Sequence, residues 1–282
     1  MSQQSDSATQ TISILAGKKT TKAILMEMWA YRDLFFFLTL RDIKVIYKQT
    51  VFGFLWAFVQ PFFSVVVFTF VFGNMAKVPS DGQPYAMFSV VAVVPWTFFS
   101  SSITASSQSL LSNLNMISKV YFPRLILPFV PVSAKLVDFG IALALIMAGM
   151  LYYGVNPGFG IFYLPIMIVL MYFTASAVGV WITAFAIQYR DVKFIIGFLV
   201  HLLMYAAPVV WPASLVKETY PALWPWYGLY PLAGTIDGIR SVMLGTTINW
   251  DLILMSAMST MTLLVTGIIY FMKRERYFAD VA

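Results

Sequence analysis

Few residues in this chain could do chemistry. The stretch Gly17–Thr20 looks like the end of a phosphate-binding loop, but it lacks the upstream glycine of the G-x-x-x-x-G-K-[ST] spacing, so no cradle of backbone N–H groups can form. Asp138, three residues after Lys135, predicts a local ion pair or a lysine that reaches for the membrane interface. There are no cysteines and the single histidine is His201, so no metal site is expected. We expect neither an ATP site nor a bound cofactor in this chain.

The composition predicts a chain that lies mostly in lipid. Of its 282 residues, 60% are hydrophobic and only 11% are charged, whereas soluble domains average about 25% charged residues. So few charges cannot cover a water-facing surface. The net charge of +6 is typical of basic cytoplasmic loops, and we expect no nucleic acid partner.

Six apolar stretches are long enough to span a membrane, which takes about 20 residues. They are 51–73, 86–110, 129–153, 161–187, 194–212 and 250–272. The segment 23–50 is also apolar, but Glu27, Arg32 and Asp33 interrupt it. Because a charge at the bilayer centre costs about 2.5–3.5 kcal/mol, this segment is predicted to be an interfacial amphipathic helix with a connector.

The chain is thus predicted to be an all-α integral membrane protein with a six-span domain over 51–272. Residues 1–22 are expected to form a disordered cytoplasmic tail, and 273–282 a second cytoplasmic tail. Basic residues gather in these tails and between alternate spans, whereas the other side holds only Lys77, Lys217 and Arg240. Cytoplasmic segments are the ones enriched in Lys and Arg, so both termini are predicted to be cytoplasmic.

The segment before the last span is too apolar for a free loop and too rich in proline for a span. Over about 213–247 it is predicted to be a re-entrant helical hairpin, with Pro231 in the first turn of a helix. An apolar stripe supports the helix, formed by Leu229, Leu232, Ile236, Ile239 and Met243. Asp237 and Arg240 are spaced to pair on it. The alternative is a helix lying on the outer surface.

The connection between the second and third spans predicts a short amphipathic helix. Asn113 would cap it, Lys119 would lie on its exposed face, and Pro123 would end it. Such a helix is the type of element that docks into a soluble partner, although a plain linker remains the alternative.

Certain faces of the spans are polar or aromatic, and these should point inward, toward other helices or a lumen. The residues are Trp56, Gln60 and Phe63 in the first span and Phe198, His201, Tyr205 and Trp211 in the fifth. His201 is better explained as an interior histidine held by hydrogen bonds than as a ligand. The Ser- and Thr-rich run 100–109 indicates either tight helix packing or a pore lining.

Four motifs carry a resemblance to a known family. They are RDIKVIYKQTVFGFLWAFVQP at Arg41–Pro61, KVYFPRLILP at Lys119–Pro128, QYRDVKF at Gln188–Phe194 and RERYFADVA at Arg274–Ala282. In this order they resemble type-2 ABC exporter permeases, especially those that export O-antigen and related surface polysaccharides. The resemblance covers nearly the whole chain after residue 20.

The resemblance implies a homodimer with two separate ATPase subunits, which would bind ATP and Mg. The substrate would be a polyprenyl-pyrophosphate-linked polysaccharide, moved from the cytoplasm to the periplasmic side of the bacterial inner membrane. Its pyrophosphate would meet Arg41, Lys44, Lys48 and Arg124, although anionic membrane lipid offers these cations the same contacts.

The resemblance also implies roles for the remaining candidates. Lys119, Val120 and Tyr121 would dock the ATPase, and Tyr230 with Asp237 and Arg240 would form an outer gate. The seven inward residues of the first and fifth spans would line the channel, where aromatic rings suit sugars. Alternatives are an exporter of capsule or teichoic acid, a drug or small-lipid exporter, or an ion-coupled flippase. The scarcity of carboxylates within the spans argues against the last.

Overall fold

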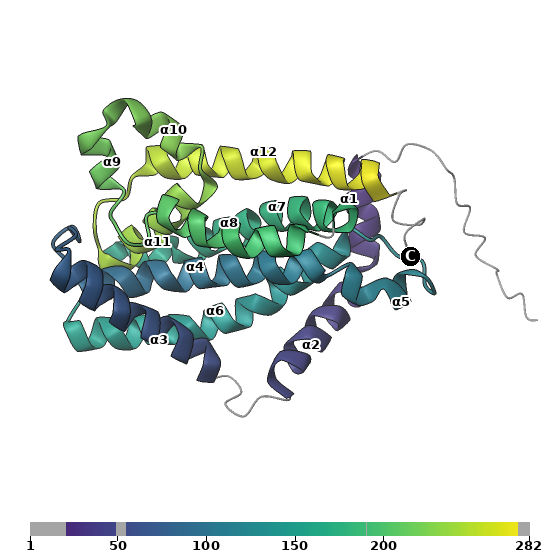
Figure 1. The fold of residues 1–282 in the computed structure, drawn as a ribbon, viewed down its shortest axis with the longest axis horizontal. Helices are drawn as coiled ribbons and strands as arrows, with labels where there is room; N and C mark the ends of the chain where they lie inside the picture. The colour runs from purple at the N-terminus through teal and green to yellow at the C-terminus, as the bar shows by residue number, and fades with distance from the viewer. Residues whose placement is uncertain (1–20, 49–54, 190, 276–282) are drawn as a thin grey trace, which may run out of the picture.

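Long helices make up the part of the chain that the structure, a computed structural model, describes: residues 21–48, 55–189 and 191–275 (Figure 1). All regular elements in these ranges are helices, so the predicted all-α class is confirmed. The predicted tails fall almost wholly on 1–20 and 276–282, and most of the connector on 49–54, which lie outside the described residues.

Five helical stretches are long and apolar enough to cross a membrane. They are α3 (Trp56–Phe68) with the π-helix η2 (Thr69–Met75), α4 (Tyr85–Gln108), α6 (Ile126–Tyr153), the 3-10 helix η4 (Gly158–Tyr163) with α7 (Leu164–Gln188), and α12 (Trp250–Arg274). At the predicted fifth span the structure places α8 (Val192–Ala206), an apolar helix of 15 residues. It is about 22 Å long at 1.5 Å per residue, against about 30 Å of hydrocarbon.

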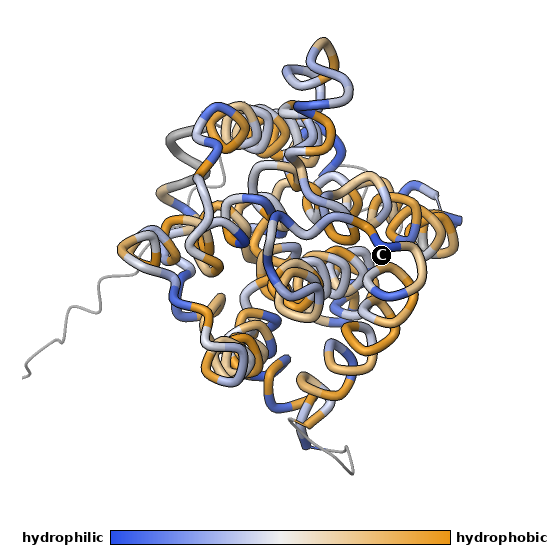
Figure 2. The backbone as a smooth tube through the Cα atoms, turned by 90° about the vertical axis from the view of Figure 1, so that its left-hand side faces the viewer, coloured by the Kyte–Doolittle hydropathy of each residue, from blue (hydrophilic) through white to orange (hydrophobic). Residues whose placement is uncertain are grey.

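Helix α4 is the centre of the bundle and packs against α3, α6, α7, α8 and α11 (Pro231–Leu244). Most of α4 is buried, whereas α3 is almost wholly exposed. Figure 2, viewed along the bundle, shows hydrophobic residues on the outer helices as well as between them. A soluble protein would not leave such a surface uncovered, and a membrane protein does so where lipid or another subunit covers it.

The Ser-rich end of α4 packs helices together. Ser106 Oγ donates to the Pro128 carbonyl at 3.0 Å, and Thr183 Oγ1 donates to the Ser106 carbonyl at 2.8 Å. A Cβ on Gly179 would lie 3.0 Å from Ser106 Oγ, so the helices approach closely. The packing interpretation of the run 100–109 is confirmed for these residues.

The N-terminal segment forms two helices, α1 (Thr21–Ala30) and α2 (Arg32–Lys48), rather than one. Leu38 of α2 is buried in a cluster with Phe122 and Phe271, whereas Phe36 and Phe37 are exposed. Helix α1, α5 (Leu114–Ile117) and the C-terminal end of α12 lie at one end of the bundle, and α9 (Ser214–Thr219) and α10 (Trp224–Gly228) lie at the other (Figure 1).

The segment after α8 folds as a helical hairpin that turns at Leu229 and Tyr230. One limb carries α9, the 3-10 helix η5 (Pro221–Leu223) and α10, and the other is α11. Pro231 is the first residue of α11, as predicted. Within α11 the predicted apolar stripe is confirmed, since Leu232, Ile236, Ile239 and Met243 are buried, whereas Leu229 precedes the helix and is exposed. Every other residue from Leu232 to Leu244 is buried as well, because a helix enclosed by neighbours needs no polar face.

Helix α12 holds the turn of this hairpin. Ser256 Oγ accepts from the Gly234 N–H at 2.9 Å and lies 3.1 Å from the Gly228 carbonyl. Ser259 Oγ donates to the Leu229 carbonyl at 2.6 Å. Since Ser259 is nine residues after Trp250, the turn lies roughly 13 Å along α12 at 1.5 Å per residue.

The contact between α11 and α12 predicts that Gly234→Ala destabilises the protein. A Cβ there would lie 2.4 Å from the Leu252 carbonyl oxygen, and backbone cannot yield as a flexible side chain can. We expect a loss of about 1–3 kcal/mol, as for overpacking, measured as a lower midpoint of thermal unfolding in detergent. Gly140→Ala in α6 is the control, because nothing lies within 4 Å of its Cβ. Equal midpoints for both variants would contradict the close packing.

Candidate functional site

The predicted channel-lining residues lie on exposed helix faces of the single chain. Trp56, Gln60 and Phe63 are exposed on α3, and Phe198, His201 and Tyr205 on α8. The described helices of the same chain therefore do not cover these side chains, so they must face a lumen, lipid or a second copy of the chain.

Two of the predicted lining side chains, one on α8 and one just after it, make hydrogen bonds within the chain. His201 Nδ1 lies 2.6 Å from the Gly197 carbonyl of its own helix, so this histidine is hydrogen-bonded but not interior. Trp211 is half-buried after α8, and its Nε1 donates to the Tyr205 carbonyl at 3.1 Å.

A pocket of about 150 Å³ lies where α2 ends and α3 begins, against α4 and α6. We call it the inner pocket, and Tyr47, Trp56, Gln60, Lys135 and Asp138 are among its lining residues. Lys135 Nζ lies 2.8 Å from Asp138 Oδ2, with both side chains largely buried. The predicted local ion pair is confirmed, and the lysine does not reach for the interface.

Tyr47 is a residue of this pocket that the sequence did not indicate, because its partner is 91 positions away. Its hydroxyl donates to Asp138 Oδ1 and so joins α2 to α6. Burial raises the pKa of Tyr47, and the hydrogen bond and charge of Asp138 raise it further. Tyr47 therefore stays a neutral donor at physiological pH.

The four predicted phosphate-binding cations do not share a partner. Lys44 and Lys48 are exposed on α2. Arg41 donates from Nη1 to Asn113 Oδ1 at 2.9 Å and from Nη2 to Asp42 at 2.8 Å. Arg124 Nη1 instead donates to the Glu275 carbonyl at the end of α12, at 3.1 Å.

The predicted docking helix is shorter than expected. Helix α5 ends at Ile117, so Lys119, Val120 and Tyr121 follow it in an irregular segment, and their placement on a helix is wrong. Two neighbouring residues explain why the helix does not continue. Phe122 is only 3% exposed and packs into the core, and Pro123 restricts the residue before it to extended backbone.

The exposed part of this connection still offers an apolar surface, since Val120 and Tyr121 are each 57% exposed. Tyr121 OH donates to Glu27 Oε1 of α1 at 3.2 Å. Asn113 precedes α5 but makes no side-chain capping bond; its amide nitrogen donates to the Ser109 carbonyl at 2.7 Å. The capping prediction is wrong, because Ser109 and Arg41 already engage the Asn113 amide.

The predicted Asp237–Arg240 ion pair in α11 is also wrong. Asp237 Oδ2 accepts from Asn249 Nδ2 at 3.0 Å. Arg240 Nη2 donates to the Pro208 and Val209 carbonyls at 2.5 and 3.2 Å. Each side chain binds a residue of another segment instead, because packing places that residue within hydrogen-bond distance.

These contacts cap the end of α8. A helix end leaves carbonyls without a partner further along the helix, and hairpin side chains donate to carbonyls of this region. Tyr230 OH donates to the Leu203 carbonyl at 3.0 Å, and Tyr227 OH to the Ala206 carbonyl at 3.2 Å. The Arg240 guanidinium completes the cap and lies 3.7 Å from the centre of the Phe88 ring.

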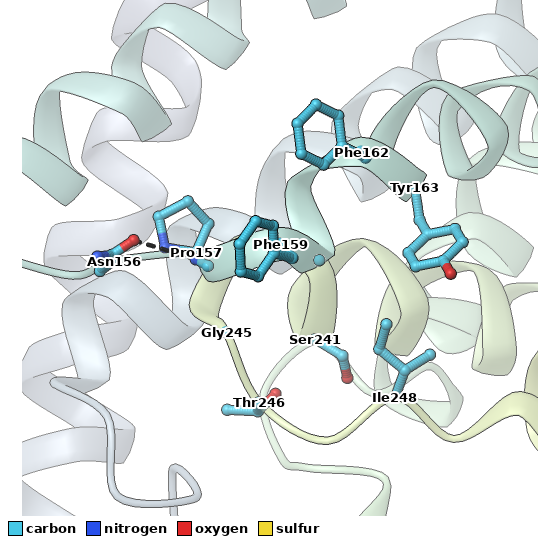
Figure 3. Close-up of a pocket in the computed structure, with 11 residues that line it drawn as sticks. Asn156, Pro157, Phe159, Phe162, Tyr163, Ser241, Gly245, Thr246 and Ile248 are labelled. Carbon is cyan, nitrogen blue, oxygen red and sulfur yellow. Dashed lines mark hydrogen bonds between the residues drawn. The ribbon is translucent and has the colours of Figure 1, made fainter.

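A larger cavity, of about 540 Å³, lies at the hairpin end of the bundle, between η4 and the end of α11 (Figure 3). Gly245 has a φ of +68° there, and a Cβ would lie 2.7 Å from the Asn156 carbonyl. Phe159 and Phe162 on its rim are 89% and 76% exposed. No charged side chain lines it, and none of the predicted site residues does.

A model of the ABC-2 type transporter family matches residues 33–244, from α2 to the end of α11. The chain belongs to the ABC-2 type transporter family. It is 26% identical over 251 residues to the O-antigen export system permease protein RfbA of Klebsiella pneumoniae, covering 88% of this chain and 95% of that protein. It is 27% identical over 195 residues to a protein of the same name from Myxococcus xanthus, covering 69% and 74%.

These matches confirm the resemblance to type-2 ABC exporter permeases. Together with the five long apolar helices, they make this ABC-2 protein an integral membrane protein. The matched range includes the hairpin helix α11, so the capped end of α8 lies within the family region rather than in an appended segment.

The cap on α8 predicts that Arg240→Met loosens the segment after that helix. The methionine keeps an apolar stem but cannot donate to the Pro208 and Val209 carbonyls. Hydrogen bonds from charged groups contribute about 1.5–3 kcal/mol, so opening should increase roughly tenfold or more. The measurement is maleimide labelling of Val210→Cys, a buried position in a chain without other cysteines.

Lys217→Met is the matched control, because this cation is exposed and only lies over the Trp224 ring at 5.3 Å. Its labelling rate should equal that of the parent. A parental rate in Arg240→Met would mean that the guanidinium does not hold the segment.

Proposed function

We propose that this chain is the transmembrane permease of an ATP-driven exporter that moves a polyprenyl-pyrophosphate-linked polysaccharide of O-antigen type. The direction is from the cytoplasm to the periplasmic side of the bacterial inner membrane. The observation that carries the proposal is the match to O-antigen export permeases over most of the chain. The absence of a phosphate cradle in the sequence agrees with a transport subunit that is not itself an ATPase.

In this proposal α8 is the fifth of six spans, and the hairpin is re-entrant. A helix of 15 residues is short for a span, but backbone at membrane depth is tolerated where protein satisfies it. The hairpin side chains that cap α8 meet that condition. The N-terminal helices and the end of α12 lie together at one end of the bundle (Figure 1), which supports two cytoplasmic termini.

Two copies of the chain would pair and enclose the passage. The exposed faces of α3 and α8 support this, because they carry the aromatic and polar side chains that lipid alone would not require. Those residues are Trp56, Gln60, Phe63, Phe198, His201 and Tyr205, with Trp211 at the outer end of α8. Aromatic rings offer sugars flat apolar surface while Tyr and Trp keep a polar group.

Each copy would bind one separate ATPase subunit, which holds the ATP and Mg. The docking surface would be the irregular segment Lys119–Tyr121 beside α1, where two adjacent apolar side chains are exposed. At the other end, Tyr230, Asp237 and Arg240 would hold the outer gate closed by binding the hairpin to α8 and Asn249.

The lipid pyrophosphate would meet Lys44 and Lys48, whose ammonium groups are exposed on α2. Arg41 and Arg124 would border this site, although each also binds a partner within the chain.

Replacing both exposed lysines tests the substrate part of the proposal. Lys44→Gln with Lys48→Gln removes two charge-assisted contacts, each of about 1.5–3 kcal/mol, so export should fall about tenfold or more. Surface polysaccharide is measured by blot beside protease accessibility of the N-terminus. Lys18→Gln with Lys19→Gln changes the net charge equally and should export normally. Full export by the Lys44 and Lys48 variant would leave these lysines as topology anchors only.

Charging the docking segment tests the ATPase partner. Val120→Asp with Tyr121→Asp should reduce co-purification of the ATPase about tenfold, since each buried carboxylate adds an unpaired charge to the interface. Membrane insertion should stay normal. Tyr220→Asp with Leu223→Asp, at similarly exposed positions near the opposite end, should bind the ATPase as the parent does. Unchanged binding by the Val120 and Tyr121 variant would place the docking surface elsewhere.

A further inference from the structure

The inner pocket places ionised groups inside a candidate span. Lys135 and Asp138 belong to α6, one of the helices apolar enough to cross a membrane. A partly buried ion pair rarely adds net stability, since desolvation offsets its attraction, and ionisable residues within spans usually mark a binding or transport path. The pair also opens onto a space rather than onto packed side chains.

The charges of the pocket are balanced, which decides what kind of ligand suits it. The Asp138 carboxylate lies 2.8 Å from the Lys135 ammonium and offsets its charge, so little attraction is left for a phosphate. What remains is a mixture of donors and acceptors: an ammonium, a carboxylate, the Gln60 amide, and the hydroxyls of Thr97 and Ser101. Such a mixture matches a neutral group with several hydroxyls, each of which both donates and accepts.

The walls and the size fit one sugar ring. Trp56 stands at the pocket with about half of its surface exposed, and the rings of Phe98 and Phe139 pack against each other at 5.2 Å on the inner side. A volume of about 150 Å³ has room for roughly ten water-sized groups, at about 10–15 Å³ for each. A pyranose ring with its substituents has about twelve non-hydrogen atoms, so the pocket matches one sugar ring in size.

The location relates this pocket to the phosphate-binding lysines. Tyr47 lines it, and Lys44 and Lys48 lie within one turn of Tyr47 on α2. We propose that the inner pocket binds one sugar ring, the one adjacent to the pyrophosphate of the lipid-linked polysaccharide. The identity of the whole ligand rests on the proposed function, whereas sugar binding by the pocket does not.

The test measures protection of a cysteine in the pocket wall. Ser101→Cys in the full chain, held in lipid nanodiscs, is labelled with a water-soluble maleimide. The probe is n-octyl β-D-glucoside below its micelle concentration. At twice its dissociation constant the probe should slow labelling about threefold by mass action. Thr104→Cys, exposed outside the pocket and three residues further along α4, should label at an unchanged rate.

A second probe separates a sugar site from an anion site. n-Octyl phosphate has the same alkyl chain with an anionic head group, and it should not protect Ser101→Cys. Equal protection by both probes would make the pocket a site for any amphiphile, and protection by the phosphate alone would make it an anion site. Protection by neither would mean that no site exists. Each of these three outcomes overturns the proposal.

Variants in the pocket test the residues. Gln60→Leu removes one polar group at an exposed position of α3, so the fold should be unaffected and protection should fall several-fold. Ser64→Ala, on the same helix, is the control, because its hydroxyl only donates to the Gln60 carbonyl at 3.0 Å. Asp138→Asn should abolish protection. Full protection in both Gln60→Leu and Asp138→Asn would overturn the assignment.

Binding is read here without ATP and without export, so the two proposals can fail separately. If the glucoside protects the cysteine and the Lys44 and Lys48 variant exports normally, the sugar site is retained and the pyrophosphate contact is rejected. If that variant loses export but the glucoside gives no protection, the proposed exporter function is retained and the sugar site is rejected.

Discussion

Buried backbone polar groups must find partners within the protein, and the end of α8 shows how this chain provides them. The helix ends at Ala206, where the Leu203 carbonyl still accepts the Ala207 N–H at 3.0 Å, and a helix terminus leaves the later carbonyls without such a bond. Tyr227, Tyr230 and Arg240 donate to carbonyls between Leu203 and Val209. Because all three donors belong to the hairpin, the end of α8 and the hairpin stabilise each other.

The hairpin in turn depends on close contact with α7 and α12. The hydrophobic effect does little to hold helices together in lipid, so small residues and hydroxyls take its place. Gly234 lets α11 approach the backbone of α12, and Thr260 Oγ1 lies 3.0 Å from Thr174 Oγ1 of α7. Helices α7, α11 and α12 therefore pack tightly against one another.

The opposite half is arranged differently. There α2 is joined to α6 by the Tyr47–Asp138 hydrogen bond and by packing of Leu38, and a polar space remains between them. Helices α3 and α8, which carry the exposed predicted lining residues, both pack against α4. The inner pocket is thus the place where polar side chains of α2, α3, α4 and α6 face an open space.

The sequence by itself determined the features that depend on local pattern. Apolar runs placed five long helices, three prolines excluded a span over the hairpin, and Pro231 marked the start of α11, because hydropathy and backbone restrictions act within a few residues. Only the tertiary structure decided which polar groups meet. Asp237 and Arg240 are three apart on one helix, yet each binds a residue of another element, and Tyr47 finds Asp138 across 91 positions. Sequence spacing shows which residues of one helix can contact each other. Packing brings residues of other helices closer than these neighbours, and no local sequence pattern encodes the distances between helices.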